Sequence, residues 1–296
     1  MKRTNINTFL PVIVLYKTKL KDSSTYNTLN VSLKSSIVAD SIDVVVYDNS
    51  PEAHLVESTD LLNVVYYHDA SNGGISKAYN YALSIAQENE IDWLLLLDQD
   101  SELPLDFIDN CLSDLRLHHD NFLIAAIVPT VYCGSKLISP CKVGWGGKLF
   151  PIKDHSTRVP LYEITAINSG ALVKVAFLDS IGGFSNEFWL DMLDHWLFRT
   201  IYCKEMNVVV GHNKIYHDLS INNYSKISLE RYQNIISAES HFSLTHRSVL
   251  HRTVFRIRLA VRVLKFIFIH KRTDLSSMTL SYVFKGVMFF ICIQNG

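Results

Sequence analysis

Short apolar runs divide the first third of the chain, and each run ends in polar residues. The runs 9–16, 42–47, 64–67 and 93–97 suit strands that are buried on both faces of a parallel sheet. Between them, apolar residues recur at helical spacing over 26–38 and 75–87. This β-α-β-β-α-β order predicts an α/β fold with a mostly parallel, nucleotide-binding type of sheet flanked by helices.

The next hundred residues are predicted to complete the same domain. Helices are expected over 105–117, 175–181 and 191–203, and strands over 123–128, 164–173, 208–210 and 214–217. Residues 129–160 lack a regular pattern, and a long irregular segment in a compact domain is often a substrate loop. We therefore expect a catalytic domain over residues 1–223 and a helical C-terminal region over 224–296.

Two carboxylates follow the most apolar run of the chain. Residues 93–101 read WLLLLDQDS, so Asp98 and Asp100 come directly after four leucines. At the carboxyl end of a parallel strand they would lie where open α/β sheets bind ligands. Paired carboxylates can hold Mg2+ or Mn2+, whose shell is completed by substrate phosphates. The alternative is a strand followed by an acidic turn without function.

Two further loops have residues suited to a nucleotide. Asp48 follows the second strand, and a carboxylate there can accept the ring N–H of a uracil or thymine. Asn72 and Gly73 precede a helix, whose free N–H groups and Lys77 in its first turn suit a phosphate. Each pattern also fits an ordinary turn.

The helix predicted over 191–203 carries acids in its first turns. Asp191 and Asp194 lie three positions apart, so a helix would direct both toward one pocket. Acids in the first turn of a helix also interact favourably with the helix dipole, so they need have no catalytic role. His217 is either a surface histidine or a third metal or phosphate contact. Trp145, in the irregular segment, and the Ser169-Gly170 pair are candidates for the acceptor pocket, which would bind a second substrate.

Composition narrows the class of protein. The chain has 296 residues, of which 48% are apolar, and a net charge of −1, which argues against a nucleic-acid partner. Its five cysteines show no metal-binding or disulfide spacing, which favours reduced thiols in a cytosolic setting. The apolar run near the N-terminus is short and β-branched, so we interpret it as a strand and not as a signal peptide.

The C-terminal region has a different charge pattern. Residues 241–273 contain no acid and eight basic residues interleaved with apolar ones. Such basic amphipathic helices lie in membrane interfaces, and residues 281–293 fit a second interfacial helix. The alternative is packing against the catalytic domain or against a second subunit of a homo-oligomer. The basic residues are Arg247, Arg252, Arg256, Arg258, Arg262, Lys265, Lys271 and Arg272.

Taken together, these motifs resemble the family 2 glycosyltransferases of the GT-A fold, over about residues 9–223. The resemblance is greatest to bacterial rhamnosyltransferases of O-antigen and polysaccharide assembly. It rests on PVIVLY, VVVYDNS, NGGISKAYNYAL, WLLLLDQDS, NSGALV, GGFSNEFWLD and YHDLS, in this order.

The resemblance assigns roles to the candidate residues. Asp48 would bind the base in a pocket lined by Tyr16, and Asn72, Gly73 and Lys77 would lie near the ribose and phosphates. Asp98 and Asp100 would form the Asp-x-Asp pair at the nucleotide and metal. The general base would be Asp194 or, as the close alternative, Asp191, although the acidic run here is one residue shorter than the family pattern.

The reaction implied is an inverting, metal-dependent transfer of a sugar, with dTDP-L-rhamnose as the expected donor and a lipid-linked glycan as the acceptor. The enzyme would be peripheral on the inner face of the cytoplasmic membrane. The alternatives are a UDP-hexose-dependent transferase (glucosyl, galactosyl or galactofuranosyl), a nucleotidyltransferase, and a membrane-docked binding protein without activity.

Overall fold

The computed structural model describes residues 8–36, 41–118, 120–152, 162–216 and 227–293, with side chains in the last helix as far as Phe284. The chain divides into two compact units. The first contains residues 1–142 and 151–218, and the second contains 143–150 and 219–296. The sequence placed the division near residue 223 and gave no sign that 143–150 group with the C-terminal helices.

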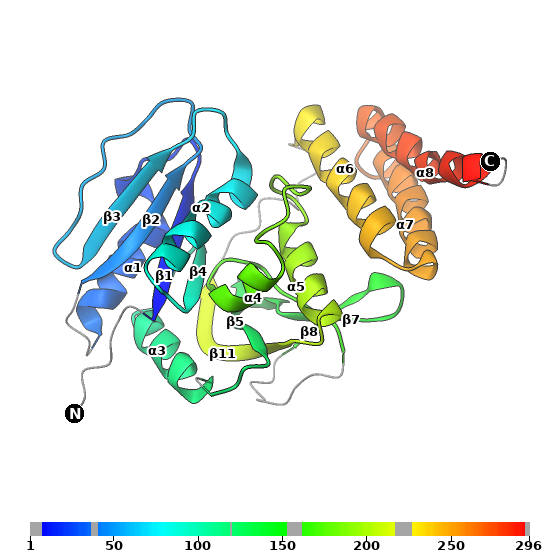
Figure 1. Ribbon diagram of the computed structural model, residues 1–296. Helices are drawn as coiled ribbons and strands as arrows, with labels where there is room; N and C mark the ends of the chain where they lie inside the picture. The colour runs from blue at the N-terminus through cyan, green and yellow to red at the C-terminus, as the bar shows by residue number, and fades with distance from the viewer. Residues whose placement is uncertain (1–7, 37–40, 119, 153–161, 217–226, 294–296) are drawn as a thin grey trace. The chain divides into compact units, whose positions relative to one another are not determined.

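The described part of the first unit is organised around one eight-stranded sheet (Figure 1). The strand order is β11-β5-β10-β4-β1-β2-β3, and β6 pairs with β5. Neighbours among β1 to β4 are parallel, whereas β10 runs antiparallel between β4 and β5. The predicted mostly parallel α/β sheet is therefore confirmed. Its strands are β1 (Phe9–Leu15), β2 (Ile42–Asp48), β3 (Leu62–His68), β4 (Trp93–Asp98), β5 (Ile124–Cys133), β6 (Lys136–Ser139), β10 (Ala171–Lys174) and β11 (Asn207–Tyr216).

Helices cover both faces of this sheet, which explains the uninterrupted apolar runs. Ile13, Val46 and Leu97 lie side by side in the register and join Leu29 and Phe107, from the helices on one face, in the main apolar cluster. Their neighbours along each strand point to the opposite face, which α2 covers (Figure 1). The helices are α1 (Ser24–Ser35), α2 (Gly74–Glu88), α3 (Phe107–His118), α4 (Val175–Ser180) and α5 (Leu193–Cys203).

The segment predicted to be irregular, 129–160, is largely ordered as short strands. β5 continues to Cys133, and residues 134–135 form a two-residue hairpin loop before β6. Gly134 has φ +57°, a conformation that suits hairpin turns. Two further strands, β7 (Cys141–Val143) and β8 (Leu149–Pro151), flank a short 3-10 helix, η2 (Trp145–Gly147). The prediction of irregular structure over 130–151 was wrong, and 153–160 lie outside the described residues.

Smaller departures occur at other elements. The two strands predicted over 208–217 are one strand, β11, with a shift of register between Val210 and Lys214. β9 (Ile164–Thr165) pairs antiparallel with β7. The 3-10 turn η1 (Leu20–Asp22) precedes α1, and the hydroxyl oxygen of Ser23 caps that helix by accepting the N–H of Tyr26 at 3.2 Å.

The second unit contains α6 (Leu229–His246), α7 (Val249–Phe268) and α8 (Thr273–Ile293), together with η2. Tyr232 and Leu259 are fully buried between these helices, and the hydroxyls of Tyr232 and Thr279 lie 2.6 Å apart. The predicted helical C-terminal region therefore forms helices with a core of their own. In the part of the chain that the structure describes, no helix is long and apolar enough to cross a membrane.

Candidate active site

Two strands on either side of β1 bring acidic residues to one edge of the sheet. In the register, Val14 of β1 lies opposite Asp98 of β4, and Leu15 lies opposite Asp48 of β2. Tyr16 follows β1 directly and is 42% exposed. The predicted placement of Asp48 and Asp98 at the carboxyl edge is thus confirmed, and open α/β sheets bind ligands at this edge.

The turn after β4 is held by buried hydroxyl groups. The N–H of Asp98 donates to Ser169 Oγ at 3.2 Å, and Ser169 Oγ lies 2.7 Å from Ser101 Oγ. The N–H of Ser101 donates to Thr25 Oγ1 at 2.9 Å, and the Thr25 hydroxyl donates back to the Ser101 carbonyl at 3.1 Å. These bonds fix the direction in which the turn presents its carboxylates. The sequence gave no indication of the roles of Ser101 and Thr25.

The middle residue of the Asp-x-Asp motif ties the turn to β1. The side-chain carbonyl of Gln99 accepts the N–H of Tyr16 at 2.8 Å, and its backbone carbonyl accepts the Ser23 hydroxyl at 2.7 Å. Asp98 is half-buried, whereas Asp100 is exposed. Gln99 therefore serves as a structural link, and Asp100 is left at the surface of the edge.

Ser169 and Gly170, which were candidates for the acceptor pocket, have structural contacts. Ser169 is 1% exposed and supports the Asp98 turn. Gly170 has φ +81°, and a Cβ added there would lie 2.3 Å from Ile215 Cδ1, so a larger residue would strain the backbone and displace Ile215. Their roles toward an acceptor stay predictions.

Asp48 lies in a buried network that the sequence did not predict. Its carboxylate accepts the N–H of Ser50 at 2.9 Å and the Tyr66 hydroxyl at 2.8 Å, and it lies 2.8 Å from His54 Nδ1. Burial alone would raise the pKa of Asp48, but the hydrogen bonds from Ser50, Tyr66 and His54 outweigh it and lower the pKa. A carboxylate has about four acceptor sites. The hydroxyl and N–H of Ser50, the Tyr66 hydroxyl and His54 account for all four, so binding of a base, which stays a prediction, would displace one of them.

Asp69 organises the loop that leads into α2. Its carboxylate accepts the Ser71 hydroxyl, the Tyr47 hydroxyl at 2.8 Å and the N–H groups of Ser71 and Gly73. Hydrogen bonds from Ser71 first, and then from Tyr47 and the loop backbone, lower the pKa of Asp69 to about 2. Asn72 adopts φ +52° in this loop. The loop is therefore fixed before any ligand binds.

Lys77 is the cation nearest to this loop on α2. It is exposed, and it has no hydrogen-bond or ion-pair partner among the described residues. The first N–H groups of α2 are partly used, because Gly74 donates to Asn49 Oδ1 at 3.3 Å and Ile75 donates to the Trp189 carbonyl at 3.0 Å. Of the predicted phosphate contacts, the Lys77 ammonium is the most accessible.

A row of hydrogen bonds joins α2 to the segment before α5. The indole N–H of Trp189 donates to the Asn72 carbonyl at 2.7 Å. The Ser76 hydroxyl donates to the Ser185 carbonyl at 2.8 Å, and Asn80 exchanges two bonds with the backbone of Phe184, at 2.9 and 2.8 Å. These contacts bring the acidic segment near residue 191 to the loop at residue 72.

The two candidate bases do not lie on one helix, so that prediction was wrong. α5 begins at Leu193, and Met192 before it has the left-handed backbone conformation, with φ +69°. Asp194 lies in the first turn of α5, and its carboxylate accepts the N–H of His195 at 2.7 Å. Asp191 precedes the helix. A non-glycine residue with positive φ leaves no pattern in the sequence, so the later start could not be predicted.

A buried tyrosine relates Asp194 to the Asp-x-Asp motif. Tyr79 of α2 is fully buried beside Phe184, and its hydroxyl has no partner among the described residues. Burial raises the pKa of Tyr79 well above its ordinary value, and the negative charges of Asp98 and Asp194 raise it further. The two carboxylates therefore act on the same hydroxyl, from β4 and from α5.

The donor set at the edge suits a cation whose shell a ligand completes. Asp98 and Asp100 supply carboxylate oxygens, which Mg2+ and Mn2+ prefer. Among the described residues, no group of three acidic, histidine or cysteine side chains is gathered to hold a metal. Asp98 and Asp100 therefore stay predicted metal ligands. His217, the third predicted ligand, lies outside the described residues.

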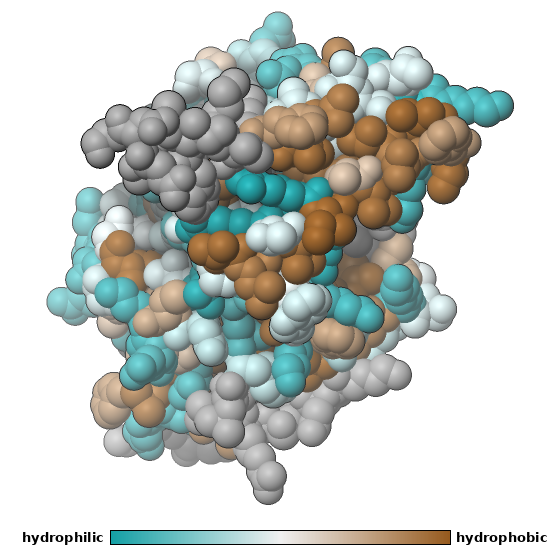
Figure 2. Space-filling model, turned by 90° about the vertical axis from the view of Figure 1, so that its right-hand side faces the viewer, coloured by the Kyte–Doolittle hydropathy of each residue, from teal (hydrophilic) through white to brown (hydrophobic). Residues whose placement is uncertain are grey.

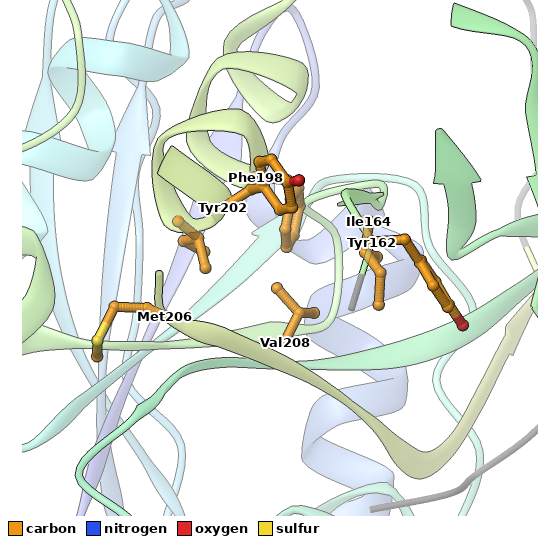
Figure 3. Close-up of a pocket in the computed structure, with 7 residues that line it drawn as sticks. Tyr162, Ile164, Phe198, Tyr202, Met206 and Val208 are labelled. Carbon is orange, nitrogen blue, oxygen red and sulfur yellow. The ribbon is translucent and has the colours of Figure 1, made fainter. Parts of the chain in front are cut away.

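Two other features do not involve these carboxylates. Figure 3 shows a small hollow between α5, β9 and β11, lined by Tyr162, Ile164, Phe198, Ile201, Tyr202, Met206 and Val208. Its lining includes none of the candidate site residues. Trp145, a candidate acceptor residue, belongs to the second unit.

Comparison with known proteins gives a match to one family over part of the chain. The family described as Glycosyl transferase family 2 matches residues 23–158, which include Asp48, the loop at 72–74 and the Asp-x-Asp pair. Over these residues the chain is similar to that family. Its sheet and helices have the fold of GT-A glycosyltransferases.

Individual relatives are distant. The chain is 27% identical over 194 residues to the dTDP-rhamnosyl transferase RfbF of Shigella flexneri, and the match covers 64% of this chain and 62% of that protein. Among solved structures, it is similar to the mannosyltransferase PcManGT from Pyrobaculum calidifontis in complex with GDP-Man and Mn2+, at 12% identity and a TM-score of 0.50, covering 95% of this chain and 87% of that one. S. aureus TarS 1-349 in complex with UDP gives 17% identity and a TM-score of 0.49, covering 89% and 73%.

Gly74→Ala is expected to destabilise the protein by more than about 1 kcal/mol. Gly74 has φ +82°, and a Cβ there would lie 2.2 Å from the Trp189 carbonyl oxygen, so the substitution separates Trp189 from α2. Urea denaturation measures the loss. Gly182→Ala is the matched control, because Gly182 has φ +78° and nothing lies within 4 Å of its added Cβ. Equal losses in the two variants would contradict a specific contact with Trp189.

Proposed function

We propose that this protein is an inverting glycosyltransferase that moves a sugar from a nucleoside diphosphate to a hydroxyl acceptor. One observation carries the proposal. At the carboxyl edge of the sheet, a fixed Asp-x-Asp turn lies beside β1, and hydrogen bonds join the loop-helix at 72–77 to the segment that presents Asp194. The similarity of residues 23–158 to glycosyl transferase family 2 also supports transfer of a sugar.

The residues of the site would have separate roles in the reaction. Lys77 offers a positive charge to the diphosphate, and Asp98 and Asp100 would hold Mg2+ or Mn2+ against its oxygens. When bound, the ion supplies charge neutralisation for the leaving nucleotide. Asp194 accepts the proton of the acceptor hydroxyl as that oxygen attacks the anomeric carbon. A single displacement inverts the anomeric centre and needs no covalent link between sugar and enzyme.

For the donor, we propose dTDP-L-rhamnose. The support is the similarity to a protein described as a dTDP-rhamnosyl transferase, together with the DQDS form of the motif. A UDP-hexose is the alternative donor in the same fold. The acceptor we propose is a lipid-linked glycan, as in the bacterial polysaccharide pathways to which the sequence motifs point.

Nucleotide binding tests the donor proposal. The purified protein is titrated with dTDP and with UDP, with and without Mn2+, while its thermal unfolding is followed. A ligand at a hundred times its Kd stabilises the native state by about 2.7 kcal/mol, so we expect dTDP with Mn2+ to raise the Tm more than UDP does.

The outcomes separate the parts of the proposal. A larger rise in Tm with UDP than with dTDP would contradict the rhamnosyl assignment but would leave the proposed glycosyltransferase activity in place. No shift with either nucleotide would contradict the nucleotide site itself. If turnover released pyrophosphate in place of a nucleoside diphosphate, the protein would be a nucleotidyltransferase and not a glycosyltransferase.

A further inference from the structure

One face of α7 is apolar and uncovered. Leu250, Ile257, Val261, Leu264 and Phe268 follow one another at spacings of seven, four, three and four residues, so they form a single ridge along the helix. Their exposed fractions run from 47% to 74%. The buried contacts of α7 are made by other positions, such as Leu259 and Phe266. The ridge therefore takes no part in the core of the second unit.

A distant segment of the chain extends this ridge. η2 packs on α7, where a Cβ on Gly146 would lie 2.9 Å from Val254 Cγ1 and where Arg258 Nη1 donates to the Gly147 carbonyl at 3.2 Å. Trp145, the first residue of η2, is 74% exposed. Figure 2 shows apolar side chains gathered on the face of the molecule that carries these helices. We call the five ridge residues and Trp145 the α7 surface.

The α7 surface is bordered by positive charge that the protein does not neutralise. Arg258 and Lys265 follow ridge residues by one position and are exposed. Neither has an acidic partner among the described residues, whereas Arg262, on another side of the helix, pairs with Glu239 at 2.7 Å. The stretch 241–273 contains no acid at all.

We propose that the α7 surface docks on an anionic phospholipid bilayer, with the ridge in the interface and Trp145 as its aromatic anchor. Helices with an apolar face and flanking cations lie in the plane of the headgroups, and tryptophan is enriched at that depth because its ring is apolar and its N–H polar. Anionic lipid attracts unpaired arginine and lysine near the membrane. A second copy of the chain is the weaker fit, because a symmetric contact places the same positive border against itself.

This inference goes beyond the proposed reaction, and its test needs no sugar transfer, so either can fail alone. The full chain is mixed with vesicles of phosphatidylcholine alone, or of phosphatidylcholine with phosphatidylglycerol, and binding is measured by flotation. We expect binding to the anionic vesicles only, weakened by added salt. Leu264→Glu is expected to reduce it by at least about tenfold. Leu117→Glu is the matched control, because Leu117 is 61% exposed on α3, and it should bind like the unmodified protein.

Fluorescence tests the part assigned to Trp145. Anionic vesicles should shift the emission of the unmodified protein to shorter wavelength, and Trp145→Phe should abolish that shift while the other three tryptophans remain. Unchanged binding of Leu264→Glu, equal binding to neutral vesicles, or an unchanged shift in Trp145→Phe would each overturn the proposal. The proposal would also be overturned if sedimentation showed a dimer that does not bind vesicles and that Leu264→Glu dissociates. The α7 surface would then be an interface with a second copy of the chain.

Discussion

Asp100→Asn is expected to lower the rate of sugar transfer by about three orders of magnitude, because charge stabilisation at the leaving diphosphate is worth about 4 kcal/mol. Asp100 is exposed at the carboxyl edge, so its loss leaves the buried turn beneath it in place. The measurement is nucleoside diphosphate release at saturating donor, with a membrane extract that supplies the acceptor.

Two further readouts make this test independent of the acceptor. In the thermal titration, Mn2+ should add to the nucleotide-induced shift of the unmodified protein and add nothing for Asp100→Asn. Asp106→Asn is the control, because Asp106 is also exposed and is not a candidate site residue. Full activity of Asp100→Asn with any divalent ion would contradict the metal assignment.

The parts of the site that were predictable depend on local pattern. Four leucines followed by Asp98 predict a buried strand that ends in an acid, and the structure places Asp98 at the end of β4 with those leucines fully buried. Asp48 follows from the same reasoning. In a parallel sheet, the end of a strand also fixes the edge on which its last residue lies, so the location of both acids was available without the structure.

The parts that were not predictable depend on contacts between distant segments. Tyr66 reaches Asp48 only because β2 and β3 pair in one register, and Trp189 reaches Asn72 across 117 residues. Neither contact leaves a periodic signal. The positive φ of Met192 leaves no such signal either, and the helix that follows it carries Asp194 but not Asp191.

η2 illustrates the same limit at the level of a whole unit. Residues 143–150 lie within the sequence of the catalytic domain, and Trp145 was therefore placed among the acceptor residues. The contact between Gly146 and Val254 joins this segment to α7, and a Cβ added at Gly146 would lie 2.9 Å from Val254 Cγ1. A pair of glycines after a tryptophan is typical of a turn, and it does not indicate which helix the turn meets.

Asp194→Asn is expected to lower kcat by about two to four orders of magnitude, the usual contribution of a general base. The amide cannot accept the proton of the attacking hydroxyl. Nucleotide affinity should be unchanged, because Lys77 and the Asp-x-Asp turn are untouched. The measurement combines kcat from nucleoside diphosphate release with the thermal titration, so that loss of binding and loss of chemistry are separated.

Asp191→Asn decides between the two acids. Asp194 lies in the first turn of α5, while Asp191 precedes the left-handed Met192. Asp191→Asn and Asp194→Asn therefore make the same change before the helix start and within its first turn. If Asp194 is the base, Asp191→Asn keeps most of the activity. If the larger loss falls on Asp191, the base comes from the segment that Trp189 anchors to α2. Gly74→Ala, which separates Trp189 from α2, should then lower kcat at temperatures where that variant is still folded.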